Sequence, residues 1–253
     1  MQHLSRWHVA KCVILLQFHL LYGMTISIII PTLNEAALIE RLISFVQTYG
    51  GDAVLEIIVA DGGSTDDTLT KAHHLGARVI TVPQPGRAIQ MNAGASLARG
   101  ELLYFIHADT LPPASFAMDI QEAIRSGVAF GRYRTQFDSN RWLLKCNAFF
   151  TRFDWPVCYG GDQTLFISAS FFSSLGGYDE NLLIMEEYEL TARAKRFGKY
   201  IVLPKAALVS ARKYELNSWW RVQRANYLVV KMYQRGSSQQ LLINRYQQLL
   251  RSR

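Results

Sequence analysis

The sequence Leu102-Leu103-Tyr104-Phe105-Ile106-His107-Ala108-Asp109-Thr110 decides the fold. Its first five residues are apolar and it lies between Gly100-Glu101 and Pro112-Pro113, which predicts a short strand buried on both faces, as in the middle of a parallel sheet. His107 and Asp109 follow that strand, at the carboxyl edge where open α/β sheets bind their ligands. A carboxylate fixed there suits a divalent cation that also binds phosphates. We therefore expect Asp109 to bind a metal, although an Asp after a strand is also common as a cap or turn residue.

Strands and helices alternate before this stretch. The expected strands are residues 26–30, 57–60 and 78–82, and the expected helices are residues 38–46, 67–75 and 88–98. This order predicts an α/β fold with a mostly parallel, Rossmann-like sheet, helices on its faces and right-handed crossovers. Polar residues follow the ends of the strands: Thr32, Asn34, Asp61, Asp66, Arg87 and Asp109. Four loops are thus expected to converge on one edge of the sheet.

The second half of the chain has a different pattern. We expect strands at residues 128–137 and 164–167, an aromatic-rich helix at 142–153, a helix at 186–197, and terminal helices rich in Trp, Tyr and Arg after Pro204. Glu186, Glu187 and Glu189 open the helix at 186, where acids are favoured by the helix dipole. The dipole is a sufficient structural reason for two of these three acids.

Charge is distributed unevenly along the 253 residues. From Lys195 onward there are 13 of the 27 Lys and Arg residues and a single acid, Glu215, so this part carries +12 while the whole chain carries +7. A basic face suits diphosphates or anionic lipid, and an ordinary solvated surface is the structural alternative. The preceding body shows no interleaving of aromatic and basic residues, so no nucleic-acid partner is expected.

Residues 1–23 differ from the rest, and we interpret them as an appended or mis-started leader. Residues 13–16 are apolar but too short to span a bilayer, and Met24 directly precedes the first strand. We divide the remainder into residues 24–112 and 113–253, as halves of one structural domain.

The cysteines suggest a reducing compartment. Cys12, Cys146 and Cys158 have no paired spacing and no nearby His pattern, so neither a disulfide framework nor a zinc site is expected. A cytoplasmic protein, resting on the inner face of the membrane or free of it, fits this composition.

Three common nucleotide and hydrolase motifs are absent. Asp61-Gly62-Gly63-Ser64 follows a strand but does not match Gly-x-Gly-x-x-Gly, and its Asp suits a ribose or base better than a pyrophosphate. The chain has neither a Gly-x-x-x-x-Gly-Lys loop nor a Gly-x-Ser-x-Gly elbow, which disfavours P-loop phosphotransferases and serine hydrolases.

An ordered series of motifs resembles family 2 glycosyltransferases with the GT-A fold. The series comprises Pro31-Thr32-Leu33-Asn34-Glu35, Asp61 to Asp66, Gly86 to Ala95, His107-Ala108-Asp109-Thr110 and Gly161-Asp162-Gln163. Three elements, Gly86 to Ala95, His107 to Thr110 and Ser210-Ala211-Arg212, resemble a narrower subgroup labelled arsenosugar-biosynthesis glycosyltransferases.

The resemblance implies roles for individual residues. The residues implied in nucleotide-sugar binding are Pro31, Thr32, Asn34, Glu35, Asp61, Gly63, Asp66, Arg87 and His107. Asp109 matches the second acid of the family's Asp-x-Asp motif and would bind Mg²⁺ or Mn²⁺ against the diphosphate. His107 stands where the first acid is usual, which puts a two-carboxylate metal site in doubt.

The resemblance also implies a general base and an acceptor side. Glu186-Glu187 matches the family's Glu-Asp pair, so Glu187 is the expected base, with Glu186 and Glu189 as alternatives. Asp162 and Gln163 would border the acceptor or the donor sugar, although a turn is an equally good reason for Asp162. The implied reaction is one inverting displacement that moves a sugar, most simply a hexose, from a nucleotide-diphosphate sugar to a hydroxyl acceptor.

Other readings remain open at this point. A nucleotidyltransferase shares the fold type but needs a Gly-rich first loop, which residues 31–35 lack. A catalytically inactive nucleotide-sugar-binding or membrane-docking protein is favoured only by His107. The Trp219-Trp220 helix, with Arg221, Arg224 and Lys231, could lie on a membrane near a lipid-linked acceptor, or it could simply pack.

Overall fold

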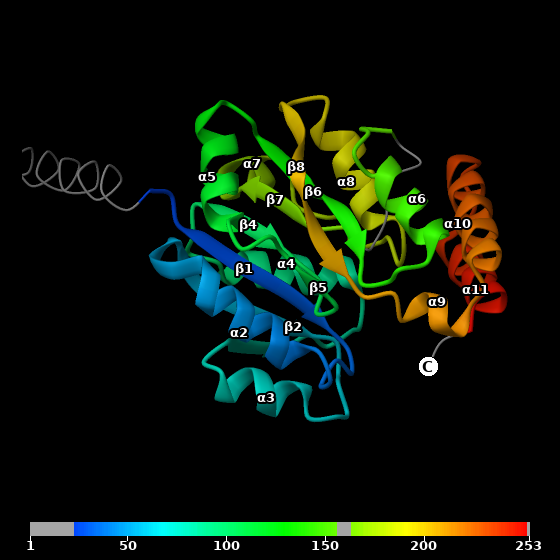
Figure 1. Cartoon of the computed structure of the whole chain (residues 1–253), viewed down its shortest axis with the longest axis horizontal. Coiled ribbons are helices and arrows are strands. Elements are labelled where there is room, and N and C mark those ends of the chain that lie inside the picture. Colours follow the sequence, from blue (N-terminus) through cyan, green and yellow to red (C-terminus); the bar gives the residue numbers. More distant parts are fainter. Residues whose placement is uncertain (1–22, 156–162, 252–253) are drawn as a thin grey trace, which may run out of the picture.

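The computed structural model describes residues 23–155 and 163–251, and within them eight strands form one sheet. The strand order is β3-β2-β1-β4-β7-β6-β8-β5, with helices on both faces (Figure 1). The strands are β1 (Ile26–Thr32), β2 (Val54–Asp61), β3 (Arg78–Thr81), β4 (Leu102–Phe105), β5 (Thr110–Leu111), β6 (Phe130–Phe137), β7 (Leu165–Ser168) and β8 (Tyr200–Val209).

The first four strands form the parallel half that the sequence predicts. β1 lies between β2 and β4 and pairs with both in parallel, and β3 extends the sheet beside β2. All seven residues of β1 are buried, because helices cover both faces of the sheet. This half therefore brings the carboxyl ends of β1, β2 and β4 to one edge.

Two helical layers sandwich this sheet. The helices are α2 (Ile39–Gly50), α3 (Thr68–His74), α4 (Arg87–Leu97), α5 (Phe116–Arg125), α6 (Trp142–Phe150), α7 (Ala169–Ser174), α8 (Glu186–Ala194), α9 (Lys213–Leu216), α10 (Trp219–Gln234) and α11 (Gln239–Leu249), with a 3₁₀ turn η1 (Gly51–Ala53). Residues of α2, α3 and α5 share one apolar cluster, and residues of α4, α7 and α8 share another. Loops at the carboxyl edge therefore approach from both layers.

Helix α4 packs closely on the sheet, as its small residues predict. A Cβ added at Gly94 would lie 2.6 Å from Ile29 Cγ2, so this position has no room for a side chain. One turn earlier, buried Gln90 donates through Nε2 to the carbonyls of Thr32 at 2.7 Å and Ala60 at 2.8 Å. These bonds fix the ends of β1 and β2, because a buried backbone acceptor needs a partner.

The second half of the sheet is mixed, and part of it was not predicted. β7 runs antiparallel to β4 and β6, β6 pairs with β8 in parallel, and β5 pairs with β8 antiparallel. Strand β8 and helices α5 and α7 have no counterpart in the sequence-based expectation. The expected helices at 142–153 and 186–197 end earlier, at Phe150 and Ala194.

The C-terminal helices form a separate layer at one end of the molecule. α10 and α11 pack together through Val222, Ala225, Val229 and Leu242, and α6 lies next to them (Figure 1). Trp219 packs here and donates through Nε1 to Asn147 Oδ1 at 3.2 Å, whereas Trp220 is 71% exposed. Among the described residues, no helix combines the length and apolarity needed to cross a membrane.

Candidate active site

His107 and Glu187 are far apart in the sequence, but their side chains are in contact at the carboxyl end of β4. His107 follows β4, Glu187 lies in the first turn of α8, and His107 Nε2 is 3.0 Å from Glu187 Oε1. Their side chains are only 12% and 13% exposed. The other carboxylate oxygen, Glu187 Oε2, is buried and has no hydrogen-bond partner in the described part of the chain. An unsatisfied buried oxygen costs free energy, which makes this carboxylate a candidate functional group.

The surroundings of the site shift the pKa values of His107 and Glu186. Burial disfavours the charged imidazolium, but the hydrogen bond and charge of Glu187 outweigh burial, so the pKa of His107 is raised. Burial, together with the neighbouring charge of Glu187, raises the pKa of Glu186. The nearby positive charge of Arg87, the first residue of α4, favours the lower pKa for both groups and so opposes these two increases. The site thus concentrates acids and a cation at the junction of α4 and α8.

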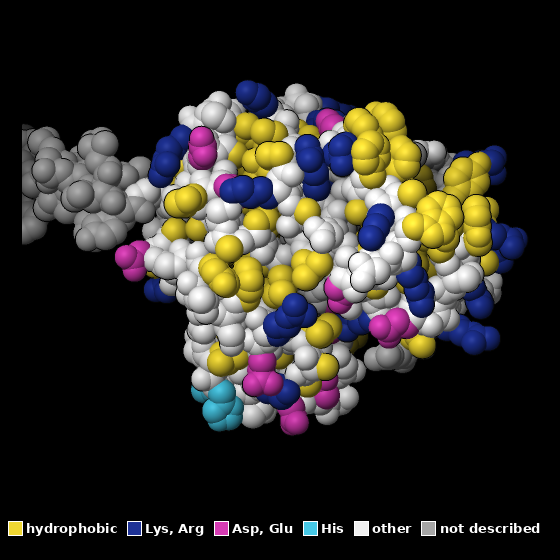
Figure 2. All heavy atoms as spheres, in the orientation of Figure 1, with side chains coloured by type: hydrophobic (Ala, Val, Ile, Leu, Met, Phe, Trp, Pro, Cys, Tyr) yellow, Lys and Arg dark blue, Asp and Glu magenta, His cyan; other side chains and the backbone are white. Residues whose placement is uncertain are grey.

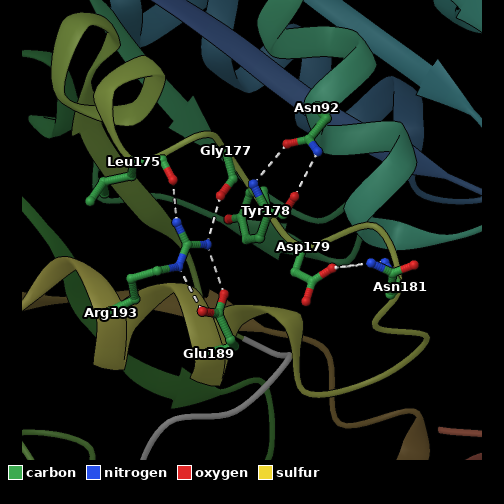
Figure 3. A network of polar contacts seen from close by, with 8 residues as sticks. All are labelled: Asn92, Leu175, Gly177, Tyr178, Asp179, Asn181, Glu189 and Arg193. Atoms are coloured by element: carbon green, nitrogen blue, oxygen red, sulfur yellow. Dashed lines mark hydrogen bonds and ion pairs between the residues drawn. The ribbon is translucent and has the colours of Figure 1, made fainter.

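The third acid of this turn, Glu189, has a different role. Its carboxylate binds Arg193 one turn later, with Nε at 2.6 Å from Oε1 and Nη2 at 2.8 Å from Oε2 (Figure 3). Arg193 also donates to the carbonyls of Leu175 and Gly177. Glu189 therefore anchors α8 to the turn before it, and of the three acids Glu187 has the free oxygen next to the sheet edge.

A second set of contacts in Figure 3 fixes the same turn to α4. Asn92 donates through Nδ2 to the Tyr178 carbonyl at 2.9 Å, and its Oδ1 accepts from the Tyr178 amide at 2.9 Å. Just before α8, Met185 has φ of 73°, a left-handed conformation that is uncommon for a residue with a side chain. The start of α8, and with it Glu187, is held by specific contacts on both sides.

Asp109 lies in a charged cluster that the sequence reasoning did not foresee. Arg212, which follows β8, binds Glu35 through both terminal nitrogens, at 2.7 Å and 2.5 Å. Its Nη2 is also 3.3 Å from Asp109 Oδ2, and the Ser210 amide donates to the Asp109 carbonyl at 2.9 Å. These carboxylates, with Glu35 first, raise the pKa of Arg212. The only signal for Arg212 was its place in the Ser210-Ala211-Arg212 motif.

The carboxylate of Asp61 is buried and used within its own loop. Oδ2 accepts from the amides of Gly63 at 2.8 Å and Ser64 at 2.7 Å, and Oδ1 accepts from Thr32 Oγ1 at 3.1 Å. Gly63 has φ of 98°, which only glycine adopts readily. Asp61 thus shapes the loop that follows β2 and ties it to the end of β1, beside Pro31.

Asn34 and Asp66 link the loops after β1 and β2. Asn34 adopts a left-handed φ of 56°, and its Oδ1 accepts from the Thr65 amide at 2.8 Å. Asp66 accepts from the Ala36 amide and from the amide and hydroxyl of Thr68. Burial alone would raise the pKa of Asp66, but these hydrogen bonds outweigh it and lower the pKa.

The expected acceptor residues are placed only in part. Gln163 directly precedes Thr164 and the strand β7, whereas Asp162 lies outside the described residues. The structure therefore brings together His107, Glu187 and Arg87 on one side, and Asp109, Glu35 and Arg212 on the other, with Ala108 between His107 and Asp109.

The side chains around Asp109 offer few oxygen donors for a metal ion. No group of three or more His, Cys, Asp or Glu side chains that could hold a metal ion occurs in residues 23–155 and 163–251. Asp109 contributes a single carboxylate whose Oδ2 faces Arg212. Mg²⁺ in proteins is often bound by one or two carboxylates plus substrate phosphates and water, so Asp109 fits such an ion when a diphosphate supplies further oxygens.

The comparisons with known proteins identify the family. Residues 27–174 match the family model described as "Glycosyl transferase family 2", so the chain belongs to the family 2 glycosyltransferases. A "PGL/p-HBAD biosynthesis glycosyltransferase" from Mycobacterium bovis is 31% identical over 191 residues, which cover 66% of this chain and 68% of that protein. A glucosyl-3-phosphoglycerate synthase from Mycobacterium tuberculosis is 36% identical over 99 residues, 36% of this chain and 31% of that protein.

Solved structures share the fold. A mannosyltransferase from Pyrobaculum calidifontis in complex with GDP-Man and Mn²⁺ matches 81% of this chain and 62% of its own, with a TM-score of 0.61 and 22% identity. The M. tuberculosis glucosyl-3-phosphoglycerate synthase with Mn²⁺ and UDP matches 85% of this chain and 81% of its own, with a TM-score of 0.58 and 20% identity. The mixed sheet and its helical layers are those of a GT-A glycosyltransferase.

Proposed function

We propose that this protein transfers a hexose from a nucleotide-diphosphate sugar to a hydroxyl acceptor by a single inverting displacement. One observation carries the proposal: His107 holds Glu187 Oε1, while Oε2 is buried and has no hydrogen-bond partner within residues 23–155 and 163–251. A carboxylate fixed at one oxygen and free at the other has the geometry of a general base.

In the proposed step, Glu187 takes the proton of the acceptor hydroxyl. The acceptor oxygen forms a bond to the anomeric carbon, the bond from that carbon to the diphosphate oxygen breaks, and the diphosphate leaves with the electron pair. Attack from the face opposite the leaving group inverts the anomeric centre. His107 would keep Glu187 oriented through the 3.0 Å hydrogen bond.

Asp109 would hold Mg²⁺ or Mn²⁺ together with the diphosphate. Such an ion would neutralise the charge that develops on the leaving group. We expect Arg212 to shift from Asp109 toward the incoming phosphates, since a guanidinium binds phosphate oxygens as readily as carboxylates. The relatives solved with Mn²⁺ and UDP or GDP-Man support this part of the proposal.

The loops after β1 and β2 would bind the nucleoside. Their carboxylates and amides are already joined by hydrogen bonds, so Asp61 and Asp66 would act chiefly by shaping the loops. Thr32, Asn34 and backbone groups of the same loops would then face the base and ribose, and Arg87 the phosphates. This pre-organisation would reduce the entropy lost when the donor binds.

The acceptor side is the least defined part of the proposal. Gln163 and Asp162 would border it, and a lipid-linked acceptor at the inner face of the cytoplasmic membrane would fit the basic C-terminal region. The narrower resemblance to arsenosugar-biosynthesis enzymes stays a prediction. A nucleotidyltransferase and an inactive binding protein are the alternatives that an activity assay would separate.

Donor binding can be tested by thermal stabilisation with a panel of nucleotide sugars in the presence of Mn²⁺. A true donor binds only the folded chain and raises its melting temperature, and Asp109→Asn should remove the Mn²⁺-dependent part of the shift. Activity with the best donor is then measured as release of the nucleoside diphosphate. Stabilisation that is identical with Mn²⁺ and with chelator would remove the metal role of Asp109.

A further inference from the structure

A hollow lies between helix α6 and strands β6 and β8, and neither His107 nor Glu187 lines it. Its volume is about 690 Å³. Apolar side chains of Phe137, Leu144, Ala148, Phe149, Pro204, Ala206 and Leu208 form much of its lining. Thr135 also lines the hollow. Its backbone amide donates to Thr151 Oγ1 and so fixes the end of α6 to β6.

The hollow is basic. Arg134, Lys145 and Arg152 line it, and Asp138 is the single acid among the lining residues. Asp138 Oδ1 accepts from the Ala211 amide, and the three cations outnumber this one acid. Within the described residues, neither Arg134 nor Lys145 forms an ion pair, and Arg134 Nε is buried without a hydrogen-bond partner. Arg134 Nε therefore has one N–H available for an acceptor oxygen inside the hollow.

Exposed aromatic side chains lie on α6 and just after it, and one of them, Phe149, lines the hollow. Trp142 is 69% exposed, Phe149 47%, Phe150 49% and Trp155 49%. Phe149, Phe150 and Trp155 are linked by ring contacts through Phe153, so they form one aromatic surface. In Figure 2, hydrophobic and basic side chains lie side by side over the region of β8 and α6.

Aromatic residues next to Lys and Arg are typical of surfaces at the level of lipid headgroups. The aromatic rings enter the interface between water and hydrocarbon, and the cations attract anionic headgroups. The arrangement of Arg152 illustrates this, because its guanidinium lies 3.8 Å above the Phe149 ring and so remains at the rim. A soluble phosphate would explain the cations but not the exposed rings.

We infer that the hollow between α6, β6 and β8 binds the headgroup phosphate of an anionic bilayer lipid, with the aromatic surface of α6 resting in the headgroup layer. This surface is separate from helix α10, which carries Trp219 and Trp220. The hydrogen bond between Asp138 and Ala211 connects this surface to the segment that carries Arg212, so docking would place the edge of the sheet near the membrane.

Vesicle binding of the full chain tests the inference. We expect the chain to bind phosphatidylcholine vesicles that contain phosphatidylglycerol. Binding to vesicles of phosphatidylcholine alone should be at least about tenfold weaker, because each basic residue near the surface adds to the attraction for anionic lipid. The double variant Lys145→Glu with Arg152→Glu should lose about tenfold or more in affinity. The double variant Phe149→Ala with Phe150→Ala should bind more weakly to both kinds of vesicle.

Matched controls use exposed residues on another surface. Arg78→Glu with Arg125→Glu makes the same charge change on β3 and α5, and Tyr49→Ala removes a ring on α2 that is 49% exposed; both should bind like the unmodified chain. Circular dichroism and nucleotide-sugar affinity should be unchanged in every variant, so a failure here is distinct from a failure of the proposed transferase.

Three results would overturn the inference. They are equal binding to the two kinds of vesicle, full binding by the Lys145 and Arg152 variant, and release of the bound protein by inorganic phosphate but not by sodium chloride at the same ionic strength. The last result would assign the hollow to a soluble phosphate.

Discussion

His107 and Glu187 form a hydrogen bond of 3.0 Å across 80 residues of sequence, and it joins the central strand β4 to the first turn of α8. The bond uses only Oε1 of Glu187, so it orients the carboxylate, and the buried Oε2 has no hydrogen-bond partner among the described residues. The first two predictions depend on this arrangement.

Replacing Glu187 by Gln should abolish the base without changing the size of the side chain. We expect kcat to fall by about 10²- to 10⁴-fold while the affinity for the nucleotide sugar changes little, because general base catalysis contributes about that much. Steady-state kinetics and donor titration measure the two effects. The control is Glu189→Gln, which should lower the melting temperature by weakening the Arg193 ion pair but keep most of kcat. If Glu189→Gln loses kcat and Glu187→Gln keeps it, Glu189 is the base.

His107 should act by positioning Glu187. His107→Ala should lower kcat with little change in donor affinity, whereas His107→Gln should recover part of kcat because its amide can donate to Oε1. If instead both variants lose donor affinity and keep kcat, His107 binds the nucleotide sugar directly, as the family resemblance implies. The comparison of kcat with donor affinity decides between the two roles.

Arg212 should compete with a metal ion for Asp109. Its guanidinium is 3.3 Å from Asp109 Oδ2, so Arg212→Gln should strengthen Mn²⁺ binding in the absence of nucleotide by roughly threefold to tenfold. Mn²⁺ titration followed by electron paramagnetic resonance measures this directly. Arg41→Gln is the matched control, because Arg41 borders the same small hollow as Asp109 without an ion pair to it. Unchanged Mn²⁺ affinity in the Arg212 variant would contradict the competition.

Asp66 should make the chain sensitive to acid. Its pKa in the folded state lies below the ordinary value of 3.8, so its contribution to stability is present above that pH and is lost as the pH falls through the folded-state pKa. Asp66→Asn should therefore lower the free energy of unfolding at neutral pH, with the difference from the unmodified chain shrinking below about pH 4. Urea unfolding at several pH values measures this. A stability difference that stays the same from neutral pH to below pH 4 would contradict this role of Asp66.

The parallel half of the fold could be predicted because its signals are local. Buried strands such as β1 consist of consecutive apolar residues, and polar residues follow them at one edge. The helix of small residues at 88–98 also indicated close packing, which Gly94 against Ile29 confirms. Because these features depend on residues that are neighbours in the sequence, the sequence alone predicts them.

Strand β8 could not be predicted because its signal is interrupted by Pro204. The ladder between β6 and β8 pairs Tyr133 with Leu203 and Arg134 with Ala206, so Pro204 and Lys205 lie outside the regular register. A bulge allows a proline within a strand, since no ladder bond is required of its nitrogen. The sequence alone shows the proline but not the partner strand that forms the bulge around it.

Arg212 was missed as a functional residue for a related reason. Its two carboxylate partners, Glu35 and Asp109, follow different strands, and 177 residues separate it from Glu35. No local pattern marks an ion pair of this range. Glu187, by contrast, was identified through the resemblance of short motifs, and Asp109 also from its place after a buried strand; their roles remain predictions.

The same separation has a consequence for the order in which the protein is built. During synthesis from the N-terminus, β1 and β4 emerge well before the segment after β8, so Glu35 and Asp109 face each other as two anions until Arg212 arrives. Loop closure over such a distance is a late event in folding, because its entropic cost is recovered only after β6 and β8 have paired. We therefore expect the edge that carries Glu35 and Asp109 to be completed last, after the sheet that supports it has formed.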